Sequence, residues 1–204
     1  ARFELTGGGS SAGISDTVRG ISDAALVSRP LSPQDPAGLT LTPLAISAIC
    51  LVSNPANPVP ALSRAQLQDI VAARVSSWAQ IPGARSAGPI VPVDLGPTSG
   101  AGRVFENVFV DAGTPVAWRP VSLQTTAQAR DYVEQTPDAF AYVDLALTGP
   151  LHVIAYEGVG CTRATVSDGR YPARRPLAVV TRGRPRSELR RFLRHEAGRG
   201  FAEV

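Results

Sequence analysis

Apolar stretches of two periodicities alternate along the chain. Short continuous or alternating apolar runs are typical of strands, whereas apolar residues that recur every three or four positions predict helices. The strands expected from the first pattern are 1–6, 24–27, 41–52, 89–93, 116–121, 139–143, 152–156 and 175–181. The helices expected from the second are 14–21, 62–71, 104–109, 126–135 and 186–202. Because strands and helices alternate through most of the chain, the pattern predicts an α/β fold.

The central stretch, 91–109, combines a strand, a turn and a helix. An apolar strand leads into a turn of Gly, Pro, Thr and Ser residues, and helical spacing follows Arg103. This order points free backbone N–H groups and the positive end of the helix dipole at an anion. Thr98 and Ser99 add hydroxyl donors, and Gly100 lets a ligand approach the backbone. The alternative is an ordinary capped helix entry, for which Ser and Thr are also favoured.

A second turn of the same kind lies near the beginning of the chain. The run 7–13 consists of Gly, Ser and Ala and joins an expected strand to an expected helix. Like the central turn, it offers N–H and hydroxyl donors. Two such turns in one small protein favour a cleft for an anion or another polar ligand.

Composition narrows the function classes. The chain has 204 residues, of which 44% are hydrophobic and 18% are charged. This length is enough for one large domain or two lobes with a real core. No apolar run approaches the roughly 18 residues of a membrane span. All 20 basic residues are Arg, and seven crowd the C-terminal end at 182, 184, 186, 190, 191, 194 and 199. Only Phe192 and Phe201 accompany them, so we expect the solvated face of a terminal helix and no nucleic-acid site.

The two cysteines and two histidines argue against metal and catalytic chemistry. Cys50 and Cys161 form no C-x-x-C pair, so we expect no zinc site. They are compatible with one disulfide, two buried thiols or one of each, and export from the cell would favour the disulfide. Ser10 and Ser99 are potential nucleophiles, but neither His152 in a strand nor His195 in the last helix suits a Ser–His–acid triad. We expect no catalytic residue and no cofactor.

Nine motifs follow one another in a specific order. They are G-G-G-S-S-A-G-I at 7–14, D-A-A-L-V-S-R-P-L at 23–31, P-L-A-I-S-A-I-C-L-V-S-N at 43–54, L-S-R-A-Q-L-Q-D-I-V at 62–71, S-S-W at 76–78, T-S-G-A-G-R-V-F at 98–105, A-F-A-Y-V at 139–143, G-R-Y-P-A-R-R-P-L at 169–177 and V-T-R-G-R-P at 180–185. In this order, and over nearly the whole chain, they resemble the phosphate-binding proteins of bacterial ABC importers.

The resemblance implies a type II periplasmic-binding-protein-like fold. Two α/β lobes are then joined by crossing strands and close on a ligand in the cleft between them. Lobe 1 would comprise 1–50 plus 151–204, and lobe 2 would comprise 51–150. Because Cys50 and Cys161 would both lie near the crossings, we expect them to form a disulfide. The implied protein is extracytoplasmic, is not an enzyme, and holds phosphate or another small oxyanion for an ABC permease.

The resemblance also assigns ligand-binding residues, motif by motif. Ser10 lies where the glycine-rich turn of the family donates a hydroxyl and an N–H to phosphate. Ser28 falls where many members have a phosphate-contacting Asp or Ser, and Ser99 opens the family's Ser-Gly-Thr loop. The full expected set is Gly9, Ser10, Ser11, Ser28, Thr98, Ser99, Gly100, Ala101 and Arg103.

Three departures from the family pattern bear on phosphate affinity. Leu95 stands where the family has a phosphate-binding Arg and would present an apolar side chain to the anion. Ala101 stands where the loop has Thr. The chain begins at Ala1, without an initiator Met or signal-peptide pattern, so we expect a processed or recombinant segment that lacks the family's first strand and helix. Arg103, and next Arg29, are the candidate replacements for the missing charge. The alternative function is therefore a degenerate sensor or interaction module of the cell envelope that has little or no phosphate affinity.

Overall fold

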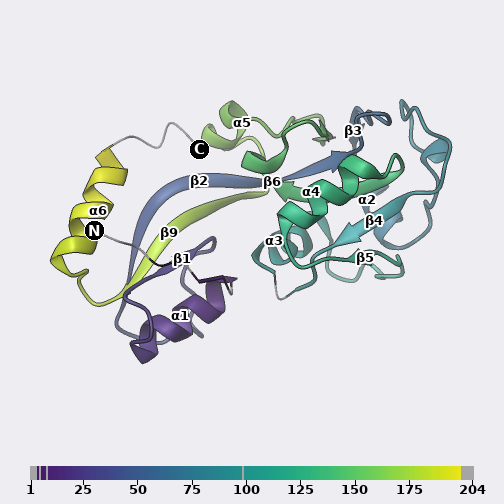
Figure 1. Cartoon of the computed structure of the whole chain (residues 1–204). Coiled ribbons are helices and arrows are strands. Elements are labelled where there is room, and N and C mark those ends of the chain that lie inside the picture. Colours follow the sequence, from purple (N-terminus) through teal and green to yellow (C-terminus); the bar gives the residue numbers. More distant parts are fainter. Residues whose placement is uncertain (1–3, 5, 8, 98, 199–204) are drawn as a thin grey trace. The chain divides into compact units, whose positions relative to one another are not determined.

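The computed structural model describes residues 4, 6–7, 9–97 and 99–198, and of the side chains in 192–198 only that of Leu193. The chain forms two compact units, Ala1–Ser47 with Arg175–Val204 and Ala48–Arg174 (Figure 1). Both boundaries fall inside strands, β2 (Leu39–Ser53) and β9 (Arg174–Arg182). The predicted lobe limits of 1–50, 51–150 and 151–204 stay a prediction, and residues 151–174 belong to the second unit.

The first unit is a small sheet with a helix packed on one strand. β9 lies between β1 (Ala25–Val27) and β2, and it pairs antiparallel with β1. The helix α1 (Gly9–Arg19) packs on β1, where Ile14, Val27 and Val180 belong to one buried cluster. The helix α6 (Ser187–Gly198) follows β9.

The second unit has a mixed sheet in the order β2-β6-β4-β5, with β7 also paired to β2. The strand β6 (Ala139–Asp144) is antiparallel to β2 and parallel to β4 (Val91–Asp94). The other strands are β5 (Val121–Ser122), β7 (His152–Val153) and a separate parallel pair, β3 (Ala61–Leu62) with β8 (Ala155–Tyr156). The helices are α2 (Arg64–Val71), α3 (Gly100–Phe109), α4 (Thr126–Gln135), α5 (Arg163–Ser167) and the 3₁₀ turns η1 (Trp78–Gln80) and η2 (Leu145–Leu147).

The core of the second unit forms around β6, which is buried from Ala139 to Val143. A strand covered on both faces is a continuous apolar run rather than an alternating one, and A-F-A-Y-V is such a run. Figure 1 shows α3 and α4 beside β6, and both helices contact it. Ser63 and Thr125 cap α2 and α4 through reciprocal bonds with the Gln three residues on. The α/β prediction is confirmed.

Three expected elements differ from those observed, and one observed helix was not expected. The first helix begins at Gly9 rather than near residue 14, because the small residues of 9–13 form its first turns above Ile14. The strand expected at 116–121 is reduced to β5, since Pro115 and Pro120 interrupt the pairing and Val116 is exposed. The strand expected at 152–156 is split into β7 and β8. The helix α5 was not expected. The strand predicted at 1–6 and the helix end predicted at 202 fall largely outside the described residues.

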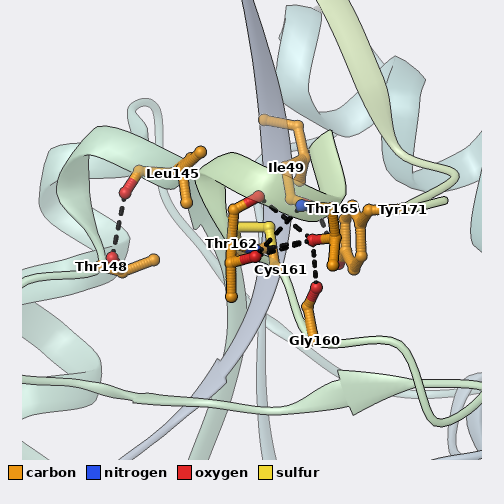
Figure 2. The surroundings of a disulfide bond; sticks show 9 residues. Ile49, Leu145, Thr148, Gly160, Cys161, Thr162, Thr165 and Tyr171 are labelled. Carbon is orange, nitrogen blue, oxygen red and sulfur yellow. Dashed lines mark hydrogen bonds between the residues drawn. A yellow bond between two sulfur atoms is a disulfide. The ribbon is translucent and has the colours of Figure 1, made fainter. Parts of the chain in front are cut away.

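Cys50 and Cys161 form the predicted disulfide, and both lie in the second unit. Their Cα atoms are 5.6 Å apart, within the usual span of a disulfide. Figure 2 shows the surroundings of this bond, where the Thr165 hydroxyl donates to the Gly160 carbonyl at 2.6 Å. The bond fastens the chain just before α5 to β2, because Cys161 precedes the N-cap Thr162. The Tyr171 hydroxyl donates to the Ile49 carbonyl at 3.2 Å, beside the disulfide.

Among the described residues, no helix is both long and apolar enough to span a bilayer. The same residues contain no group of three or more His, Cys, Asp or Glu side chains that could hold a metal ion.

Candidate functional site

Three polar side chains meet at the beginning of α1. Ser10 lies in the first turn of the helix, and its hydroxyl oxygen accepts the backbone N–H of Ser28 at 3.1 Å. Ser28 follows β1 directly, so the strand end and the helix start are held together. The Ser28 hydroxyl accepts a hydrogen bond from Nη1 of Arg175 at 3.2 Å. We call Ser10, Ser28 and Arg175 the Ser10 cluster. All three belong to the first unit.

Arg175 gives this cluster its positive charge. It lies near the beginning of β9 and is only 8% exposed, whereas its neighbour Arg174 is exposed. A guanidinium stays protonated in proteins and offers five N–H donors in a planar fork that fits oxyanions. The first N–H groups of α1 have no partner within the helix and carry its positive dipole end. The cluster therefore combines hydroxyl, amide and guanidinium donors, which suits a small anion.

Sequence reasoning missed Arg175. The only local signal is its position at the start of an apolar strand, where alternation buries one of two adjacent arginines. Of the other expected residues of this region, Gly9, Ser10 and Ser11 lie in the first turn of α1. Gly9 has φ +79°, a left-handed conformation that favours glycine, and it opens the helix. Gly9 and Ser11 are exposed, and Ser10 is partly buried.

The second group of expected residues lies at the start of α3, in the second unit. Ser99 is the N-cap, and its hydroxyl oxygen accepts the N–H groups of Ala101 at 3.2 Å and Gly102 at 3.4 Å. Thus the capped helix entry is present. A hydroxyl that accepts in this way still has its own proton to donate. The cap therefore does not prevent Ser99 from binding an anion.

The other residues of this loop contribute less. Ala101 is buried and has no hydroxyl, and Gly100 is partly exposed. Arg103 is exposed, and its Nε donates to the carbonyl of Pro97 at 2.9 Å, along its own loop. Thr98 lies outside the described residues. Among the described loop residues, the hydroxyl of Ser99 and the backbone amides are the donors that suit an anion.

Leu95 is part of the core and does not face solvent. Leu95 is 6% exposed and packs within the hydrophobic core. The expectation that it presents an apolar side chain to an anion is therefore wrong. Its backbone N–H donates to the hydroxyl of Tyr142 at 2.9 Å, and this hydroxyl donates in turn to Oδ1 of Asp94. Burial, with the hydrogen bond to Asp94 next, raises the pKa of Tyr142 well above its usual range. Tyr142 therefore stays a neutral donor that fixes the end of β4.

The start of α3 is packed closely on the turn before it. A Cβ at Gly102 would lie 1.9 Å from the carbonyl oxygen of Gly96, so only glycine fits there. Phe105, one helical turn on, stacks on Tyr142 with ring centroids 4.4 Å apart. Together these contacts position the amides of the first turn of α3.

Arg29, the second candidate for the missing charge, already has a carboxylate partner. Its Nη1 and Nη2 donate to the two carboxylate oxygens of Asp35 at 2.6 and 2.7 Å. The Arg29 guanidinium, with help from the Ser32 N–H, holds the pKa of Asp35 well below its usual range. The pair closes the loop after β1, so Arg29 has a structural role in the folded chain.

The one histidine with a described side chain is engaged by the backbone. Nε2 of His152 lies 2.7 Å from the carbonyl oxygen of Val59, so this ring is engaged by the backbone. The side chain of His195 lies outside the described residues.

Comparison with known proteins places the chain in a family. A family model described as a PBP superfamily domain matches residues 1–204. The phosphate-binding protein PstS 2 of Streptococcus pneumoniae serotype 4 is 33% identical over 79 residues, which is 39% of this chain. The match covers 27% of that relative, so the chain spans about a quarter of the length of the curated relatives it matches.

Two solved structures share the fold. One is from Clostridium perfringens, is described as a phosphate ABC transporter substrate-binding protein, and contains bound phosphate. It has a TM-score of 0.82 and 24% identity, and the match covers 92% of this chain and 77% of that one. The other is an ABC-type phosphate transport receptor from Vibrio cholerae, with a TM-score of 0.69, 24% identity and coverage of 95% and 82%. The resemblance to phosphate-binding proteins of ABC importers is confirmed, and the chain belongs to the PBP superfamily.

Proposed function

We propose that this chain is an extracytoplasmic solute-binding protein that holds a small oxyanion, in the first place phosphate, for an ABC importer. The observation that carries the proposal is the Ser10 cluster, in which a buried guanidinium donates to the Ser28 hydroxyl, and the Ser28 N–H donates to the Ser10 hydroxyl at a helix start. Membership of the PBP superfamily and similarity to phosphate-binding relatives support it.

Arg175 is central to this proposal because it supplies a charge that the expected loop position lacks. Bonds from a charged donor are roughly twice as strong as neutral ones, and guanidinium can bind two oxyanion oxygens at once. With Arg175 in this role, neither Arg29 nor Arg103 is needed to replace the Arg that the family has at Leu95. The degenerate, non-binding alternative is not favoured, since its main motive was the absence of such an Arg.

We propose further that the Ser99 hydroxyl and the first amides of α3 donate to an oxyanion. The warrant is the family pattern at 99–101 and the capped helix start. Solute-binding proteins of this superfamily are not enzymes, and we propose that the same holds for this chain. An ABC permease as partner and a location outside the cytoplasm belong to the proposal.

Titration calorimetry with inorganic phosphate at low salt tests the proposal. We expect one site per chain, weakened about 10- to 100-fold by Ser28→Ala, because hydrogen bonds to charged groups contribute about 1.5–3 kcal/mol. Ser15→Ala is the matched control, since Ser15 is exposed on the same helix α1. Sulfate and chloride titrations give the selectivity. No heat at millimolar phosphate, or equal affinities of the two variants, would overturn the proposal.

A further inference from the structure

The net positive charge of the chain comes from its last residues. Residues 182–204 hold seven Arg and three Glu, a net charge of +4. Residues 1–181 hold thirteen Arg and fourteen Asp or Glu, a net charge of −1. The overall charge of +3 therefore comes entirely from the C-terminal region. An asymmetry of this size indicates a surface that meets negative charge.

Five arginines of this region are exposed on consecutive elements. Arg182 ends β9, Arg184 and Arg186 follow it, and Arg190 and Arg191 lie on α6. We call 182–191 the basic segment. Its only acid is Glu188.

The basic segment is not neutralised by the rest of the fold. Arg186 and Asp23 approach within 3.3 Å, but both side chains are more than three quarters exposed. Such a pair contributes little. Within the described part of the chain, Arg182, Arg184, Arg190 and Arg191 form no ion pair. Their charges are therefore available to a partner.

The surroundings of the basic segment indicate the kind of partner. The large hydrophobic residues exposed in the described chain are Ile21, Leu26, Ile46 and Val116, and none belongs to the segment. A specific protein interface needs an apolar or aromatic anchor at its centre, whereas a charged bilayer surface attracts a basic segment by electrostatics alone. The segment has no aromatic residue on which a nucleic acid base could stack.

We propose that the basic segment docks this chain on a bilayer surface that contains anionic phospholipid. Guanidinium groups bind lipid phosphates bidentately, which favours Arg over Lys for this contact. The contact uses none of the Ser10 cluster. Membrane docking is thus a role separate from oxyanion binding. It would hold a solute-binding protein near the plane of the membrane.

Sedimentation with lipid vesicles tests this inference on the whole chain. The vesicles are pure phosphatidylcholine, or phosphatidylcholine with about one third phosphatidylglycerol. The test variant combines Arg182→Gln, Arg184→Gln, Arg190→Gln and Arg191→Gln. The control combines Arg19→Gln, Arg85→Gln, Arg119→Gln and Arg163→Gln, which are exposed arginines outside the segment and change the net charge equally.

We expect the unmodified chain to bind the anionic vesicles and not the neutral ones. Each basic residue near such a surface strengthens binding about fivefold. The affinity of the test variant for anionic vesicles should therefore fall by at least about a hundredfold. The affinity of the control variant for the same vesicles should fall much less. High salt should release the chain, because the Debye length falls to about 3 Å at 1 M.

Three results would overturn the inference. They are no binding to anionic vesicles, equal losses in the two variants, and binding that persists in the test variant. Phosphate calorimetry on the test variant is expected to match the unmodified chain. The outcome for the bilayer is therefore independent of the outcome for oxyanion binding.

Discussion

Nη1 of Arg175 lies 3.2 Å from the hydroxyl oxygen of Ser28, although 147 positions separate the two residues. The contact joins the start of β9 to the end of β1, which β9 pairs with. It brings a permanent positive charge beside the hydroxyl that the family pattern assigns to phosphate.

Replacement of Arg175 should abolish high-affinity oxyanion binding. Arg175→Gln removes the charge and the fork of donors, and we expect phosphate affinity to fall by about a hundredfold or more. Arg175→Lys keeps the charge but not the bidentate geometry. Its phosphate affinity should therefore lie between those of the unmodified chain and of Arg175→Gln. Arg174→Gln is the neighbouring control on the exposed face and should leave affinity unchanged. Calorimetry measures affinity and circular dichroism verifies folding. A folded Arg175→Gln variant with full affinity would contradict the assignment.

The Ser99 loop offers a substitution that separates capping from ligand binding. Ser99→Asp retains a good N-cap, because Asp accepts the same backbone N–H bonds. It also puts a negative charge where an anion would bind. We expect Tm to change little and phosphate binding to be lost.

Ser63→Asp provides the comparison for this experiment. Ser63 also caps a helix, α2, and is not among the expected site residues, so the change should preserve both Tm and affinity. If Ser99→Asp bound phosphate as tightly as Ser63→Asp, the loop would have no role in the ligand site.

The Cys50–Cys161 disulfide should contribute a large share of the stability. Loss of a native disulfide typically costs about 2–5 kcal/mol. For a chain of this size each kcal/mol lowers Tm by about 2–4 °C. We expect added reductant to lower the Tm of the unmodified chain and to leave that of the Cys50→Ala/Cys161→Ala double variant unchanged. A reductant effect of equal size in both would show that the bond is not the cause.

The Arg29–Asp35 pair should make stability fall in acid. The folded-state pKa of Asp35 is lowered, so its contribution is fully present above the unfolded pKa of about 4 and is lost as the pH falls below it. The Tm of the unmodified chain should therefore drop more steeply below pH 4 than that of Asp35→Asn. Thermal melts across this range measure the difference. Parallel profiles would show that the pair is not coupled to folding.

Local chemistry in the sequence was sufficient for most of the elements and for two helix caps. Ser63 with Gln66 and Thr125 with Gln128 lie three residues apart, so the whole capping interaction is encoded in one helical turn. The apolar run of β6 was likewise readable. The residues alone left the pairing of Cys50 with Cys161 open, and the disulfide was expected from the family resemblance. The serines at the starts of α1 and α3 were recognised because each lies in a turn of small residues that precedes a helical pattern.

The tertiary structure decided which charge accompanies Ser28 and Ser10. Apart from its position at the start of an apolar strand, the local pattern does not distinguish Arg175 from Arg29 or Arg103. Arg29 meets Asp35 six residues away, and Arg103 lies along its own loop. Arg175 reaches Ser28 only because β9 pairs with β1, and strand pairing depends on burial over the whole unit rather than on neighbouring residues. The sequence therefore determined the kinds of donors, and the packing of distant strands determined which of them meet.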